Sequence, residues 1–192
     1  MIDYLVQLDT RLFLAINGAH SSFWDSIMLF ASGKFSWIPL YLLLTFFIAR
    51  RHLWRALFWL TAIAILVLLT DQISVHLFKN VFQRLRPSHN VTLSGLINIV
   101  DSRGGRFGFV SSHAANTFGV AVFLSFLFRK RRVTIGLLVW AFFVSYSRIY
   151  LGVHYPGDIL GGAILGTFLG ISAWQLAKRI IPVRQVKATG EA

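Results

Sequence analysis

The sequence contains no cysteine among its 192 residues, and Asp and Glu together number only seven. Without cysteine there is no disulfide framework, no thiolate metal site and no cysteine nucleophile. Charged residues of both signs make up 14% of the chain, where soluble domains usually have about 25%. Hydrophobic residues make up 56%, which excludes a disordered chain and exceeds what a soluble domain of this length can bury.

The positive charges far outnumber the negative ones, with 19 Lys and Arg and a net charge of +12. In a soluble protein this excess would suggest a nucleic-acid partner. Here the basic residues lie between long apolar runs, a pattern typical of membrane topology. We therefore predict a membrane protein with no nucleic-acid partner. Its length suits a single domain over residues 1–192.

Five apolar runs reach or approach the roughly 20 residues that a membrane-spanning helix needs. They cover residues 26–49, 56–78, 110–128, 133–150 and 159–177. The first run is the weakest, because Gly33 and Lys34 interrupt it. Residues 1–22 are expected to form an interfacial helix and lack the basic start of a signal peptide. The sequence therefore predicts an all-α fold, a polytopic membrane helix bundle with five to six transmembrane helices.

Three groups of basic residues set the predicted orientation of these spans. They are Arg50, Arg51 and Arg55; Arg129, Lys130, Arg131 and Arg132; and Lys178, Arg179, Arg184 and Lys187. Five spans place all three groups on one side, which the positive-inside rule assigns to the cytoplasm. We expect a protein of the inner (cytoplasmic) membrane. The loop 79–112 should then lie on the periplasmic side and carry part of the active site.

Most residues that can perform chemistry fall on this predicted outer side. They are Lys79, Arg84, Arg86, Ser111, Ser112, His113, Ser147, Arg148, His154 and Asp158. Arginine offers forked donors to phosphate oxygens, lysine offers a point charge, and the N-terminus of a helix near residue 112 offers backbone N–H groups. Each residue also has an ordinary role at a span end, but such roles do not explain why all gather at one membrane face. The set indicates a phosphate-handling site.

Three motifs resemble the signature of the type 2 phosphatidic acid phosphatase (PAP2) superfamily. They read Lys79-x6-Arg86-Pro87, Ser111-Ser112-His113 and Ser147-Arg148-x5-His154-x3-Asp158. The first and third match fully. The second motif is usually Pro-Ser-Gly-His in this family, and Val110 and Ser112 depart from that pattern. The motifs cover residues 79–158, and their order and spacing make the resemblance specific.

The resemblance implies a metal-independent phosphatase without a cofactor, acting on a lipid phosphate or diphosphate that enters from the bilayer. His154 would be the nucleophile, Asp158 its orienting partner and His113 the acid for the leaving oxygen. The residues implied to bind phosphate are Lys79, Arg86, Arg148, Ser111 and Ser112. These roles agree with phosphoryl-transfer chemistry, in which a neutral imidazole attacks and fixed cations balance the charge that develops.

Several alternatives stay open at this point. Substrates compatible with the sequence are undecaprenyl diphosphate, phosphatidylglycerol phosphate, phosphatidate and lipid A. A phosphotransferase would use the same phosphohistidine, and a non-enzymatic anion- or lipid-binding membrane protein would use the cations passively. Arg103 and Arg106 would bind either a second phosphate or lipid headgroups. Asp71 is expected to pair with Lys79, an arginine or a hydroxyl inside the membrane.

Overall fold

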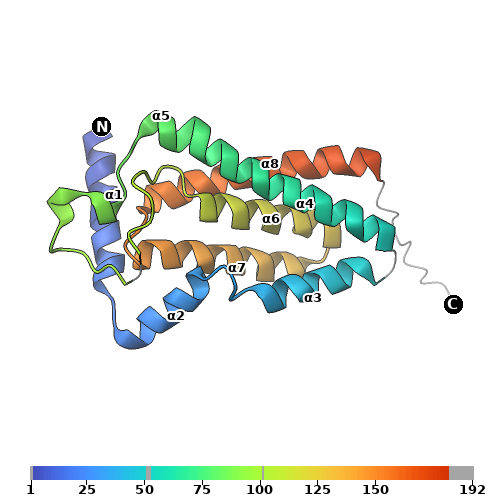
Figure 1. Ribbon diagram of the computed structural model, residues 1–192, viewed down its shortest axis with the longest axis horizontal. Coiled ribbons are helices and arrows are strands. Elements are labelled where there is room, and N and C mark those ends of the chain that lie inside the picture. Colours follow the sequence, from blue (N-terminus) through green and yellow to red (C-terminus); the bar gives the residue numbers. More distant parts are fainter. Residues whose placement is uncertain (1, 51–52, 101, 182–192) are drawn as a thin grey trace.

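The computed structural model describes residues 2–50, 53–100 and 102–181, and these residues form a bundle of helices. The helices are α1 Ile2–Gly18, α2 Ser22–Ser32, α3 Ile38–Ala49, α4 Leu53–Ile73, α5 Asn80–Phe82, α6 Ser112–Phe128, α7 Arg131–Tyr150 and α8 Pro156–Ile180. The long helices run side by side, and α1 lies across one end of them (Figure 1). This architecture confirms the predicted all-α membrane bundle.

Three of the described segments are long and apolar enough to cross a membrane. They are Leu53–Phe82, which continues α4 through a π-helical turn and α5, then Arg131–Tyr150 and Pro156–Ile180. The shorter apolar helices α3 and α6 lie beside them in the bundle. The first predicted span is divided into α2 and α3, because the chain leaves the helix at Gly33 and resumes it at Ile38.

Helix α6 lies at the centre, in contact with α4, α7 and α8. Its closest neighbour is α8, and glycine makes this approach possible. A Cβ atom on Gly166 would overlap the carbonyl oxygen of Ala115, and one on Gly170 would overlap that of Gly119. The two backbones therefore touch directly, as small residues allow in membrane bundles. This contact holds the first half of α6 against the middle of α8.

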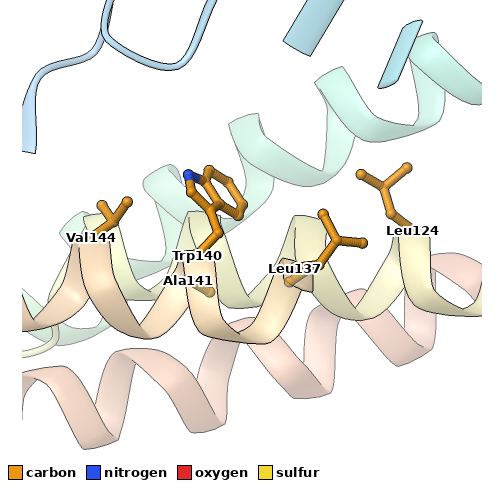
Figure 2. Packing of buried hydrophobic residues seen from close by; sticks show 6 residues of the cluster. Leu124, Leu137, Trp140, Ala141 and Val144 are labelled. Carbon is orange, nitrogen blue, oxygen red and sulfur yellow. The ribbon is translucent and has the colours of Figure 1, made fainter. Parts of the chain in front are cut away.

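Large apolar side chains fill the remaining space between the helices. One buried cluster includes Leu124 of α6 and Leu137, Trp140 and Val144 of α7 (Figure 2). A second cluster joins α4, α6 and α8 and contains Trp59, Phe123 and Trp174. The named residues of α4, α6 and α8 lie in the halves of these helices that are away from the motif residues. The polar residues that the motifs contain are thus left at one end of the bundle.

The end of α3, the start of α4, the α6–α7 connection and the end of α8 all lie at the end of the bundle opposite α1 (Figure 1). These segments carry the described basic residues Arg50, Arg55, Arg129, Lys130, Arg131, Arg132, Lys178 and Arg179. The predicted positions Arg51, Arg184 and Lys187 lie outside the described residues. The basic groups therefore share one end of the molecule, as the sequence predicted.

Helix α1 is attached to the other end through its second half. Phe13 is buried against Tyr155, with 5.4 Å between ring centroids. The Asn17 side chain donates hydrogen bonds of 2.7 Å to the carbonyl oxygens of Asn98 and Tyr150. Apolar residues of the first half, such as Leu5, remain exposed. α1 therefore forms a cap over the ends of α7 and α8, with an apolar surface that faces outward.

Candidate active site

The site lies under α1, where α6 and α8 begin and α7 ends. Gly152, with φ +82°, closes α7, and a Cβ atom there would lie 2.8 Å from the Asn98 carbonyl oxygen. The backbone N–H groups of Val153 and His154 both donate to the carbonyl oxygen of Arg148. This tight turn fixes His154 directly before α8.

His154 and Asp158 form a buried pair. The Nδ1 atom of His154 lies 3.3 Å from Oδ2 of Asp158, and the two side chains are 1% and 0% exposed. The same carboxylate oxygen accepts the Tyr155 backbone N–H at 3.0 Å, as part of a capping box at the start of α8. Because Nδ1 faces the carboxylate, Nε2 is the ring nitrogen left for chemistry.

The environment of His154 favours its neutral form. Burial lowers the pKa of His154 to about 4; the hydrogen bond that its ring donates to Asp158 opposes this effect, and the positive charges of Arg86 and Arg148 reinforce it. The imidazole therefore carries no charge at pH 7. A neutral imidazole keeps the lone pair that a nucleophile needs.

Arg84 bridges two carboxylates at the edge of the site. Its Nη1 atom donates to Oδ1 of Asp158 at 2.9 Å, and its Nη2 atom donates to Oδ2 of Asp9 at 2.6 Å. The guanidinium also lies 4.2 Å above the Tyr155 ring. The sequence placed Arg84 on the predicted outer side but outside the three motifs, and it gave Asp9 no role in the site. The available signal for Asp9 was a carboxylate in the middle of an amphipathic helix, which also contains Asp3 and Arg11.

Arg86 is enclosed by the segment that leads to α6. Its backbone N–H donates to the Arg106 carbonyl oxygen at 3.1 Å, and its Nε atom donates to the Phe107 carbonyl oxygen at 3.2 Å. Gly104 adopts φ +65°, and a Cβ atom there would overlap the guanidinium of Arg86. The loop thus wraps around the guanidinium and holds it beside α8.

Lys79 is placed by an unusual turn. Residues Ser74–Lys79 form a π-helix, a feature that often occurs at functional sites. The Lys79 Nζ atom donates to Oγ of Ser112 at 2.6 Å, and this hydroxyl lies 2.5 Å from Oγ of Ser74. Ser112, which departs from the family motif, therefore holds Lys79 at the start of α6.

The first turn of α6 brings the second motif to the same place. Ser111 caps the helix through its hydroxyl, and its backbone N–H donates to the Asp158 carbonyl oxygen at 2.9 Å. His113 is the second residue of α6, and it lies near enough to Arg148 and Arg86 to interact with their positive charges. Arg148 donates from Nη1 to the hydroxyl of Ser32 in α2. The eight predicted site residues thus lie at one end of the bundle.

Three further residues that the sequence analysis considered are Asp71, Arg103 and Arg106. No ion pair joins Asp71 to Lys79, although both residues are described; the Asp71 carbonyl oxygen instead accepts the hydroxyl of Ser74. Arg103 contributes its carbonyl oxygen, which accepts the Ser88 hydroxyl at 2.8 Å. The Arg106 guanidinium lies 5.7 Å from the centre of the ring of its neighbour Phe107. Within residues 2–50, 53–100 and 102–181, no three His, Asp or Glu side chains are grouped as metal ligands.

The sequence model of the PAP2 superfamily matches residues 57–182 of this chain. The chain belongs to the PAP2 superfamily. It is 43% identical over 183 residues to a lipid A 4′-phosphatase of Bacteroides thetaiotaomicron, covering 94% of this chain and 81% of that protein. It is 28% identical to the undecaprenyl-diphosphatase BcrC of Bacillus subtilis, covering 91% of this chain and 87% of the relative.

The fold is also that of a solved PAP2 protein. The first transmembrane PAP2-type phosphatidylglycerolphosphate phosphatase from Bacillus subtilis superposes with a TM-score of 0.72 at 22% identity, covering 94% of this chain and 90% of that one. The chain is therefore a multi-pass membrane phosphatase of the PAP2 superfamily. Asp9, Ser32 and Ser74 lie outside the three signature motifs, which explains why the motifs alone did not reveal them.

Proposed function

We propose that this PAP2 phosphatase removes a phosphate group from a lipid at the outer face of the inner membrane, through a phosphohistidine on His154. The observation that carries the proposal is the buried His154–Asp158 pair with a neutral imidazole beside several fixed cations. Asp158 fixes the tautomer and stabilises the imidazolium that develops when Nε2 attacks. A passive anion-binding protein would not need this pair.

In the first step, Nε2 of His154 attacks phosphorus and the bond to the lipid oxygen breaks. The groups that hold the phosphoryl oxygens are Lys79, Arg86, Arg148, Ser111 and Ser112. Fixed positive groups are suited to this reaction because charge accumulates on the equatorial oxygens. His113 gives its proton to the leaving oxygen, so that the lipid departs as an alcohol or as a lipid monophosphate.

In the second step, water attacks the phosphohistidine. His113 now takes a proton from the water, which microscopic reversibility requires of the group that acted as an acid before. The P–N bond breaks, inorganic phosphate is released and His154 returns to its neutral form. An acceptor lipid that replaced water in this step would make the protein a phosphotransferase.

Lipid A is the substrate that we propose first. The support is the 43% identity to a lipid A 4′-phosphatase, compared with 28% to an undecaprenyl-diphosphatase. The site lies at the end of the spanning helices, so that the acyl chains can remain in the bilayer during the reaction. The basic end of the bundle is opposite α1, and the positive-inside rule therefore supports an outer location for the site.

The test is phosphate release by detergent-purified protein in EDTA. Lipid A, undecaprenyl diphosphate, phosphatidylglycerol phosphate and phosphatidate are compared, each with wild type and His154→Ala. We expect release from lipid A that is lost in the variant. Full activity in His154→Ala would contradict the phosphohistidine. Loss of phosphate from the donor lipid only when an acceptor lipid is added, with the phosphate recovered on that acceptor, would support the phosphotransferase instead.

A further inference from the structure

We propose that Asp9 and Arg84 are positioning residues, which hold the Asp158 carboxylate in the orientation that His154 needs. This inference rests on the proposed role of His154 as nucleophile. The chain of contacts runs from Asp9 in α1, through the guanidinium of Arg84, to Oδ1 of Asp158. It connects the helix that caps the bundle to the reacting imidazole.

The first argument concerns rotation of the Asp158 carboxylate. Its Oδ2 atom serves both His154 Nδ1 and the Tyr155 N–H, while Oδ1 accepts from Arg84. If the carboxylate turned about its Cβ–Cγ bond, Oδ2 would leave the imidazole. The charged donor on Oδ1 opposes that rotation, because charge-assisted hydrogen bonds are short and strong. Arg84 therefore acts on His154 through Asp158.

The second argument concerns how Arg84 itself is held. Asp9 accepts one arm of the guanidinium, and the Tyr155 ring supports its face at 4.2 Å. The Tyr155 hydroxyl in turn accepts a hydrogen bond of 3.1 Å from the side chain of Asn90. A guanidinium with carboxylates on two of its nitrogens is less able to turn toward a substrate phosphate. Asp9 therefore keeps this cation separate from those that bind phosphate.

The third argument is that the backbone is shaped for Asp9. The Oδ1 atom of Asp9 accepts the backbone N–H of Gly157, in the first turn of α8, at 2.7 Å. A Cβ atom on Gly157 would lie 2.8 Å from Oδ2 of Asp9, so a larger residue would displace the carboxylate. Asp9 is 14% exposed and Arg84 is 27% exposed, so solvent screens their ion pair only in part. One carboxylate thus fixes both Arg84 and the helix that carries Asp158.

The kinetic test compares Asp9→Asn, Asp9→Glu, Arg84→Gln and Asp3→Asn with wild type. Asp3→Asn is the matched control, because it removes the same charge from an exposed position in the same helix. We expect Arg84→Gln to lower kcat by about 10- to 100-fold, and Asp9→Asn by about 10-fold, with KM little changed, because small displacements of reacting groups cost rates of this order. Asp9→Glu should restore most of the loss, and Asp3→Asn should match wild type.

A second measurement reports the tautomer of His154 without catalytic turnover. Nitrogen-15 NMR of labelled histidine reports the tautomer of each ring, and His154→Gln identifies the signal. We expect one tautomer, with the proton on Nδ1, in wild type and Asp3→Asn, and a mixture in Asp9→Asn and Arg84→Gln. Because this readout needs no substrate, it separates failure of the positioning proposal from failure of the proposed reaction.

Three outcomes would overturn the proposal. An Asp9→Asn protein that melts earlier but keeps the kcat and the tautomer of wild type would show that the ion pair only attaches α1 to the bundle. A rise in KM with unchanged kcat in Arg84→Gln would make Arg84 a substrate-binding residue. An unchanged His154 tautomer in Arg84→Gln would exclude its action through Asp158. Full activity of His154→Ala, in contrast, would contradict the proposed reaction itself.

Discussion

At the scale of single residues, several of the proposed site residues also support the local structure. Asp158 caps α8 and also orients His154, and Ser111 caps α6 while its backbone holds α8. Ser112 stands where the family motif has glycine, and its hydroxyl accepts a hydrogen bond from Lys79. The motifs allowed these residues to be predicted, because their spacing is encoded locally. Arg84 and Asp9 form their ion pair across 75 positions, and local spacing carries no information about such a contact.

The buried His154 predicts a dependence of stability on pH. Burial lowers the pKa of His154 to about 4, whereas an unfolded histidine has a pKa of about 6.5. Between these values the unfolded chain binds more protons, so the free energy of unfolding should decrease as pH falls from about 6.5 to about 4. The difference is on the order of 3 kcal/mol for this residue.

Thermal melting of wild type and His154→Gln at pH 7.5 and pH 4.5 measures this effect. The melting temperature of wild type should fall more on acidification than that of the variant, which lacks the titrating group. An equal fall in both proteins would show that other groups account for the pH dependence.

At the scale of elements, the bundle is organised by one close contact between helices. Gly162, Gly166 and Gly170 recur every four residues, a spacing that is typical of a close helix neighbour. The sequence could not indicate that the neighbour is α6. The break of the first predicted span at Gly33 had a sequence signal, because Gly33 and Lys34 interrupt that apolar run. The π-helical turn before Lys79 had no clear signal in composition.

Gly166→Ala should disturb this contact and the site above it. The added methyl group would overlap the Ala115 backbone, which cannot turn aside as a side chain can. We expect a loss of about 1–3 kcal/mol in the free energy of unfolding, the usual cost of overpacking. Phosphatase activity should fall as well, because α6 carries His113 and α8 carries Asp158.

Gly136→Ala is the matched control for this variant. Gly136 lies in α7, and nothing stands within 4 Å of the place where its Cβ atom would be. Alanine is favoured over glycine in helices, so this variant should be neutral or more stable than wild type. Denaturation in detergent and phosphate release measure both variants. Equal behaviour of the two variants would show that the α6–α8 contact tolerates the added methyl group.

At the scale of the whole molecule, the bundle has two chemically different ends. The described members of the three basic groups that set the predicted orientation lie at one end, while α1 and the candidate active site, which has cations of its own, occupy the other (Figure 1). Hydropathy and charge were enough to predict this division, because both act over whole segments. They did not predict how α1 packs against the bundle, because Asp9, Phe13 and Asn17 contact residues that are distant in the sequence.

The absence of cysteine allows a direct test of orientation. Ser94→Cys places a thiol at an exposed position of the loop at the site end, and Lys130→Cys places one at the basic end. In spheroplasts of an expressing bacterium, a membrane-impermeant maleimide should label Ser94→Cys. It should reach Lys130→Cys only after the membrane is permeabilised, and wild type gives the background. The reverse pattern would place the site in the cytoplasm.

The backbone contact between α6 and α8 also bears on the thickness of the bilayer. A helix whose apolar stretch is longer than the thickness of the hydrocarbon core can accommodate the mismatch by tilting. The backbones of α6 and α8 touch where Ala115 meets Gly166 and where Gly119 meets Gly170. We therefore expect the two helices to tilt together. His113 then keeps its distance from Asp158 in thin and thick membranes alike. Lipid composition should therefore alter how deep the site lies, and so how readily a headgroup reaches it, more than the spacing of the groups that react.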